Sequence, residues 1–213
     1  MVIKATPQIL KRISVRWLPD EAYENTDTIA LNVGGFYMDL RIVTADQSLE
    51  WSRAGERKAV TSEGPTTFQW TRLIDSLGGT QTDEAAFTTL PNGDDLESGI
   101  FTKDGTPTAY EEVWRDVTGD MAENTSSWIV RSKNGYAFYG KVGGICMGMR
   151  RDEQGRFEVR REDYDPSEKC WKLVFESGTG AGQGLQRAED IVLLVEGSEL
   201  GKPADYVILG HAR

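Results

Sequence analysis

Histidine and cysteine are scarce in this chain. Its 213 residues contain one histidine, His211, and two cysteines, Cys146 and Cys170. None of them stands in the HExxH, HxH or CxxC spacing of a metal or redox site, and no phosphate-binding glycine motif is present. We therefore expect no metal and no cofactor. Two cysteines do not make a disulfide framework, so we expect buried free thiols, with a single bridge as the alternative.

Long apolar runs and excess positive charge are also missing. No apolar run approaches the roughly 20 residues that a membrane helix needs, and the N-terminus lacks the apolar core of a signal peptide. The net charge is -10, with 34 acidic and 24 basic residues. Because neutralising phosphates requires clusters of Lys and Arg, nucleic acid is a poor partner. These features predict a cytoplasmic protein that binds neither a membrane nor nucleic acid.

Alternation of apolar and polar residues is the main pattern in the sequence. It is clearest at 36–42, where Phe36, Met38 and Leu40 alternate with Tyr37 and Asp39. Such alternation is typical of an antiparallel sheet with one solvated face. Ile13, Val15 and Trp17 form a similar half-buried row. Strand-length segments recur at roughly 8–12-residue spacing with little helical periodicity, which predicts an all-β sandwich or barrel. A barrel of about eight strands is wide enough for side chains or one small ligand.

A polar stretch at 119–126 is the best candidate for a domain boundary, because a fresh series of strands follows it. We expect an N-terminal barrel domain at 1–120 and a C-terminal barrel domain at 124–213. The strands expected in the second series are 128–132, 136–142, 145–151, 157–163, 171–177, 191–195 and 206–209.

Three strand segments place aromatic and charged residues two positions apart, and therefore on one face. They are Trp51 and Arg53, Trp70 and Arg72, and Tyr110, Glu112 and Trp114. Burying a charge is costly unless it is paired, so a face of this kind fits a half-polar cavity better than a packed core. We predict a ligand pocket in the first barrel, between the three tryptophans. The alternative is that the tryptophans are core residues and the arginines reach water at strand ends.

Chemical roles follow from the residue types. We expect Trp51, Arg53, Trp70 and Trp114 to bind the ligand. Glu112 is a candidate general acid or base if burial raises its pKa. Two further candidates for catalysis are Arg72, which could hold a carboxylate or enolate oxygen, and Tyr110, which could donate to a developing oxyanion. For Glu112 an ion pair with Arg53 or Arg72 is an equally good interpretation.

Several segments resemble the fungal Hri family, which is named for an interaction with casein kinase I. They are RISVRWLP, TDTIAL, MDLRI, LEWSRAG, LESGIF and YEEVWRD, with a weaker likeness in GKVGGICMGMRR. The resemblance implies two calycin-like (lipocalin-like) antiparallel β-barrels in tandem, with little helix, in a cytoplasmic or nuclear protein. It brings no catalytic motif that can be transferred residue by residue.

Three functions remain open. The first is a module that binds an apolar or aromatic small molecule in a barrel. The second is a cofactor-independent isomerase or cyclase, of the pericyclase type, that acts in the same pocket on a reactive intermediate of a fungal natural-product pathway. The third is a non-catalytic adaptor whose acidic surface binds a casein-kinase-type protein.

Overall fold

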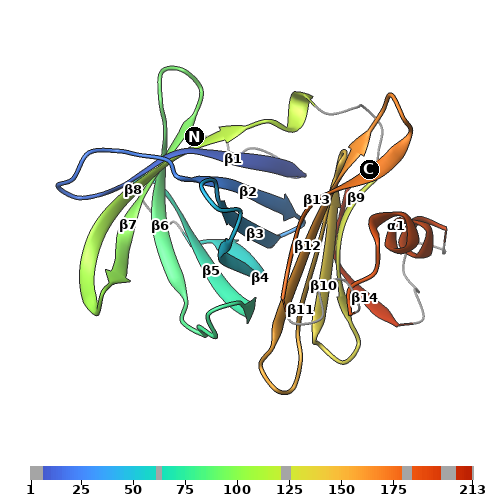
Figure 1. Cartoon of the computed structure of the whole chain (residues 1–213). Helices are drawn as coiled ribbons and strands as arrows, with labels where there is room; N and C mark the ends of the chain where they lie inside the picture. Colours follow the sequence, from blue (N-terminus) through green and yellow to red (C-terminus); the bar gives the residue numbers. More distant parts are fainter. Residues whose placement is uncertain (1–6, 61–63, 121–125, 179–183, 198–204, 213) are drawn as a thin grey trace.

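The computed structural model describes residues 7–60, 64–120, 126–178, 184–197 and 205–212. Within these ranges the chain is almost entirely β-structure, as the sequence predicted. The first series of strands is β1 (Gln8–Trp17), β2 (Thr26–Val33), β3 (Phe36–Val43), β4 (Leu49–Ala59), β5 (Thr66–Asp75), β6 (Asp83–Thr89), β7 (Asp95–Lys103) and β8 (Thr106–Asp116). Each strand pairs with the next, and β8 pairs back on β1, which closes an eight-stranded antiparallel barrel (Figure 1).

The second series forms a six-stranded sheet. After the short 3₁₀ helix η1 (Thr118–Asp120), its elements are β9 (Ser127–Ser132), β10 (Ala137–Val142), β11 (Ile145–Arg151), β12 (Phe157–Asp165), β13 (Cys170–Ser177), α1 (Ala188–Glu196) and β14 (Tyr206–Ala212). The strand order is β13-β12-β11-β10-β9-β14. The described strands therefore make an open sheet where the sequence predicted a second closed barrel.

Helix α1 explains part of that difference. The segment 191–195 was expected to be a strand, and this was wrong. A short continuous apolar run does not distinguish a strand from a buried helix. Ala188, Ile191 and Val195 are buried at helical spacing, while Leu193 between them is exposed. The buried side of the helix packs on Trp128 and other residues of one face of the sheet.

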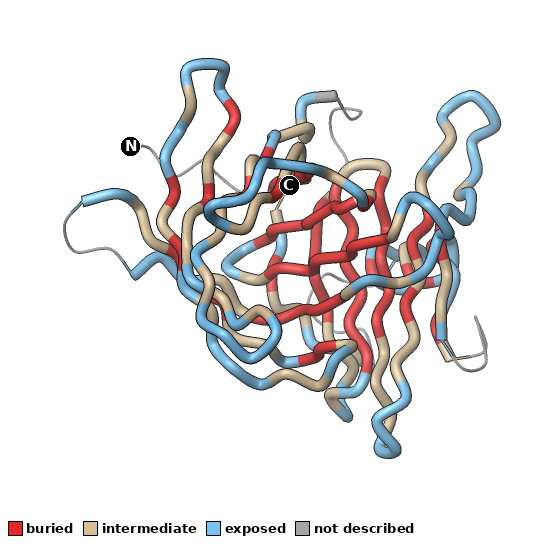
Figure 2. Tube along the Cα trace, turned by 60° about the vertical axis from the view of Figure 1, so that its left-hand side comes forward, coloured by how far each residue is buried: buried red, intermediate tan, exposed pale blue. Residues whose placement is uncertain are grey.

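The largest core lies between the outer wall of the barrel and the opposite face of this sheet. Leu31, Met38 and Leu40 of the barrel pack there with Phe138 and Met147. Figure 2 shows the buried residues concentrated where strands of the barrel cross those of the sheet. The sheet thus sits between the barrel and α1, which cover its two faces except at the exposed edge strand β13.

The alternation at 36–42 therefore has the opposite meaning from the one expected. Its apolar residues point out of the barrel into this core. Tyr37, Asp39 and Arg41 point into the barrel, where they are 2%, 4% and 8% exposed. The predicted solvated face is a buried polar interior.

The connection between the two sheets runs from Asp116, at the end of β8, to Ser127, at the start of β9. Part of the predicted boundary, residues 121–125, lies outside the described residues. Cys146 and Cys170 are both free thiols; Cys146 is buried as expected, whereas Cys170 is exposed at the start of the edge strand β13. In the described part of the chain, no helix has the length and apolar character to span a bilayer.

A backbone contact joins the barrel to the second sheet, and it yields a first prediction. A Cβ atom on Gly210 of β14 would lie 2.2 Å from the carbonyl oxygen of Val33, at the end of β2. We expect Gly210→Ala to lower the free energy of unfolding by about 1–3 kcal/mol, the usual cost of overpacking. Urea unfolding measures this, with Gly119→Ala as the control, since a Cβ there meets no atom within 4 Å. Equal stabilities for the two variants would mean that the contact between the sheets is loose.

Candidate functional site: the interior of the barrel

One end of the barrel is closed by aromatic side chains. Phe68, Trp70, Phe87 and Trp114 are buried together, with ring centroids 5.4 Å apart for Phe68–Phe87 and 5.9 Å for Trp70–Phe87. The space beside them is about 30 Å³. A water molecule needs roughly 10–15 Å³ of such space, so this end has room for water and nothing larger. We call these four side chains the aromatic plug.

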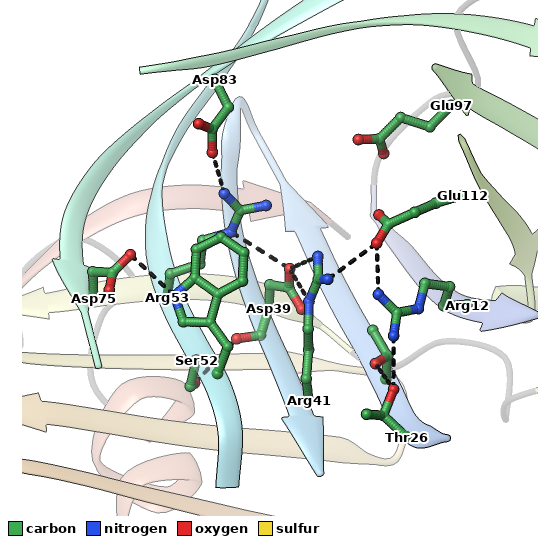
Figure 3. A network of polar contacts seen from close by, with 12 residues as sticks. Arg12, Thr26, Asp39, Arg41, Ser52, Arg53, Asp75, Asp83, Glu97 and Glu112 are labelled. Carbon is green, nitrogen blue, oxygen red and sulfur yellow. Dashed lines mark hydrogen bonds and ion pairs between the residues drawn. The ribbon is translucent and has the colours of Figure 1, made fainter. Parts of the chain in front are cut away.

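A chain of ion pairs crosses the middle of the barrel (Figure 3). Carboxylates and guanidinium groups alternate in it, and each arginine contacts two carboxylates. In order, its members are Glu24, Arg12, Glu112, Arg41, Asp39, Arg53, Asp83, Arg72 and Asp75. Because isolated buried charges are costly, this alternation is what allows so many of them inside one barrel.

Glu112 lies between two arginines of the ion-pair chain. It accepts hydrogen bonds from Arg12 Nη1 at 2.5 Å and from Arg41 Nη1 at 3.0 Å. Both bonds end on Oε1, so neither occupies Oε2. Arg12 also donates through Nε to Glu24 at 2.9 Å, and Arg41 through Nη2 to Asp39 at 3.1 Å. Each guanidinium is thus held from two sides.

The ion-pair chain surrounds the side chain of Trp51 at the end formed by Arg53, Arg72 and Asp75. Its indole Nε1 donates to Asp75 Oδ2 at 3.1 Å. The guanidinium carbon of Arg53 lies 4.2 Å from the ring centroid, and those of Arg41 and Arg72 lie at 5.0 and 5.1 Å. Such cation–π contacts are stabilising when desolvated. The ring is therefore fixed in place by the charges around it.

A cavity of about 200 Å³ lies on the other side of the ion-pair chain from the plug. Four aromatic rings in contact form part of its wall. The centroid distances are 5.8 Å for Trp51–Phe101, 6.5 Å for Phe101–Trp17 and 5.9 Å for Trp17–Tyr110. We call these rings the aromatic arc. The rest of the wall includes the charged side chains Arg12, Arg41, Glu50, Arg53, Asp83, Glu97 and Glu112.

Glu97 differs from the other buried carboxyl groups. Glu97 is 7% exposed. Within the described residues, no arginine forms an ion pair or a hydrogen bond with its carboxyl group. Its partner is the Tyr110 hydroxyl, which donates to Oε1 at 2.6 Å. Burial, and then the charge of Glu112, raise the pKa of Glu97 to about 7. The same burial, with the neighbouring carboxyl groups, raises the pKa of Tyr110. Glu97 therefore keeps its proton up to near neutral pH.

Comparison with known proteins gives a family and a fold. The family model described as "Protein HRI1" matches residues 8–191. The chain belongs to the HRI1 family. A crystal structure titled as the uncharacterized protein YLR301w from Saccharomyces cerevisiae has a TM-score of 0.76 and 16% identity, covering 97% of this chain and 99% of that one. At that identity the likeness shows a shared fold alone. No curated protein matches the sequence.

All seven side chains singled out from the sequence lie inside this HRI1-family barrel, but not in one place. Those that line the cavity are Trp51, Arg53, Tyr110 and Glu112. Trp70 and Trp114 belong to the aromatic plug, and Arg72 sits in the ion-pair chain against Asp83 and Asp75. The charges are paired with one another, and Glu112 pairs with Arg12 and Arg41 instead of the arginines considered from the sequence.

Sequence reasoning missed several residues that shape the cavity, among them Glu97, Phe101 and Arg12. Glu97 and Phe101 share strand parity in LESGIF, and that alternation was the available signal. The sequence pattern did not place Arg12 inside the barrel, because a β-bulge interrupts the alternation of strand β1. The register of β1 against β8 shifts between Arg12 and Ser14, so Arg12 and Val15 both face the cavity although their numbers differ by three.

Within the described ranges, no cluster of three or more His, Cys, Asp or Glu side chains is placed to hold a metal ion. What the interior offers chemically is an aromatic wall, three cavity-lining arginines that are each ion-paired, and one carboxyl group that holds a proton.

Proposed function

We propose that the HRI1-family barrel binds a small, uncharged aromatic molecule in the cavity bounded by the aromatic arc. The observation that carries this proposal is the combination of that arc with charges that are already paired. Binding sites are typically concave and mostly apolar, with a few polar groups that fix orientation. This cavity has the aromatic wall of such a site, together with more charged groups than usual, and its arginines are already ion-paired.

The pairing of the arginines argues for an uncharged ligand. Arg12, Arg41 and Arg53 reach the cavity, yet each is held by two carboxylates. An anion would have to displace one of these partners and leave a buried carboxylate without its counter-charge. The polar atom of the ligand is better placed against the Glu97 carboxyl group, which can donate its own proton.

The cavity also limits the size of the ligand. Its volume of about 200 Å³ lies below the roughly 300–1,000 Å³ of sites for drug-sized molecules. A bicyclic aromatic ketone suits both the volume and the donor. Catalysis in the same cavity is the second candidate function, favoured by the neighbouring carboxyl groups Glu97 and Glu112. The kinase-adaptor hypothesis remains a prediction from the acidic composition and the resemblance.

A matched pair of probes tests the binding proposal. 2-Tetralone is an uncharged bicyclic ketone, and 2-naphthoate carries a carboxylate on a similar frame. We expect calorimetry to show binding of the ketone and much weaker binding of the carboxylate. A carboxylate that bound more tightly than the ketone would contradict an uncharged ligand.

The aromatic arc should contribute directly to affinity. We expect Trp51→Leu to weaken binding of 2-tetralone by about threefold to tenfold, the equivalent of one aromatic contact of about 0.5–1.5 kcal/mol. Trp171→Leu is the control, because Trp171 lies on β13, outside the barrel. Circular dichroism must show that both variants fold. Equal affinities in the two variants would place the ligand elsewhere.

A further inference from the structure

Two carboxyl groups face the cavity side by side. Glu97 on β7 and Glu112 on β8 are direct partners in the strand register, and both line the cavity. Directly opposed residues of an antiparallel pair have Cβ atoms about 4.5–5.5 Å apart. The two residues are 7% and 4% exposed, so little water reaches either. Figure 3 shows the Glu97 carboxyl above that of Glu112, on the side away from the two arginines.

Their partners make the two groups chemically unequal. Glu112 accepts hydrogen bonds from two guanidinium groups on Oε1. Burial, and then the nearby charge of Glu112, raise the pKa of Glu97 and favour its neutral form, and they outweigh the hydrogen bond from the Tyr110 hydroxyl, which lowers that pKa. The pair therefore presents one proton donor, Glu97, and one free acceptor, Oε2 of Glu112, to the same small space. Environments that separate two carboxyl groups in this way are characteristic of acid–base pairs.

We infer that Glu97 and Glu112 act as the acid and the base that shift a proton within a bound enolisable carbonyl compound. This inference rests on the ligand-binding function proposed above and adds its substrate class and reaction. The carbonyl oxygen lies at Glu97, the adjacent C–H bond points to Oε2 of Glu112, and the ring packs on the aromatic arc.

The proton transfers balance without any co-reactant. Glu112 takes the proton from the carbon next to the carbonyl, and the electron pair of that C–H bond becomes the C=C bond of an enol. The π pair of the carbonyl moves to oxygen, which takes the proton of Glu97. Glu112 is then neutral and Glu97 ionised. Return of the Glu112 proton to the same carbon, or to the far end of a conjugated system, and of the enol proton to Glu97 restores both groups.

Tyr110 is a positioning residue in this scheme, since its hydroxyl is bonded to Glu97 Oε1. Arg12 and Arg41 play the same part for Glu112. They hold Oε1 and leave Oε2 to receive the proton.

The test uses 2-tetralone with the full-length protein in D₂O. Proton NMR follows the replacement of its α-hydrogens by deuterium, which enters when the proton on Glu112 exchanges with D₂O before it returns, or when the enol is released and takes a deuteron from solvent. Tryptophan fluorescence follows binding in the same samples. We expect exchange about 10²-fold faster than in buffer, the usual lower contribution of general acid–base catalysis. The acceleration should fall above pH 7, where Glu97 loses its proton.

Three variants separate the roles. Glu97→Gln should bind the ketone but lose the acceleration. Glu112→Asp keeps the charge and withdraws the carboxylate by one methylene, so the rate should fall about 10²-fold with binding retained. Tyr110→Phe removes the hydrogen bond that lowers the pKa of Glu97, so the fall in rate should move to higher pH. If Tyr110 had a purely structural role, its replacement would lower the rate but would not change the pH at which the rate falls.

The outcomes distinguish this inference from the binding proposal. Binding of the ketone without accelerated exchange would overturn the acid–base pair and leave ligand binding intact. Exchange that persists unchanged in both Glu97→Gln and Glu112→Asp would also overturn it. Absence of binding would overturn the proposed function and this inference together.

Discussion

Replacing Glu112 by glutamine is expected to lower the free energy of unfolding by about 3–5 kcal/mol, the usual cost of removing one partner from a buried ion pair. The loss arises because Arg12 and Arg41 both donate to this carboxylate inside the barrel. Glutamine has a similar shape and can still accept a hydrogen bond, but it carries no charge. Since Glu24 and Asp39 still partly compensate the two arginines, we expect the lower part of that range. Urea unfolding at pH 7 measures the effect.

The neighbouring residue supplies the control. Glu111 lies on the same strand but points away from the barrel interior, and its partner Arg16 is 41% exposed. Surface ion pairs contribute roughly 0.2–1 kcal/mol, so Glu111→Gln should cost less than about 1 kcal/mol. If the two variants lost the same stability, the interior charges would have to be solvated, and the case for a desolvated site would fail.

Replacing Glu97 by glutamine is expected to raise the free energy of unfolding, relative to the wild type, as the pH increases. The folded protein retains the Glu97 proton until pH reaches about 7, whereas the unfolded chain releases it near 4.5. The stability contributed by this group is therefore fully present below pH 4.5 and is lost as the pH rises to about 7. At about 1.4 kcal/mol for each unit of pKa, the loss is about 3 kcal/mol.

The Glu97→Gln variant has no such proton to lose. Its stability relative to the wild type should therefore improve by about 3 kcal/mol between pH 4.5 and pH 8, measured by urea unfolding at both pH values. In a Glu112→Asp background the improvement should persist, because the negative charge beside Glu97 is kept. A stability difference that did not change with pH would show that Glu97 ionises freely in the folded protein.

The direction of the side chains could be read from the sequence, but their partners could not. Strand parity grouped Tyr110, Glu112 and Trp114 on one face, and all three do face the barrel interior. The pairing of Glu112 with Arg12 and Arg41 depends on how the barrel closes, and on a bulge in β1 that no local pattern announces. Strand alternation predicts which side of a strand a residue lies on. Contacts between residues some 70 to 100 positions apart form only when the barrel closes.

The fold of the second half shows a similar limit. Strand rhythm predicted its strands β9 to β13 correctly in kind, but an open sheet and a closed barrel have the same local pattern. Whether the strands form an open sheet or a closed barrel depends on what packs on each face of the sheet. Here the barrel packs on one face and α1 on the other. The helix itself was missed because Ile191, Val192, Leu193, Leu194 and Val195 are all apolar, which hides the periodicity.

Glu97 was missed for a different reason. A carboxyl group that stays neutral is defined by the absence of a positive partner, and absence of a partner cannot be read from a sequence. Its neighbours Ser98 and Gly99 give no sign that it is buried. Only the completed ion-pair chain, which uses every cavity-lining arginine, sets Glu97 apart.

The apolar outer wall of the barrel has a consequence for synthesis on the ribosome. The chain is made from its N-terminus, so β8 is complete before any strand of the second sheet exists. Until residues 127–177 emerge, Leu31, Met38 and Leu40 have no partner surface to cover them. A newly made barrel therefore exposes an apolar outer surface around a charged interior, the reverse of an ordinary soluble domain. We therefore expect the first half to be prone to aggregation until the second half has been made.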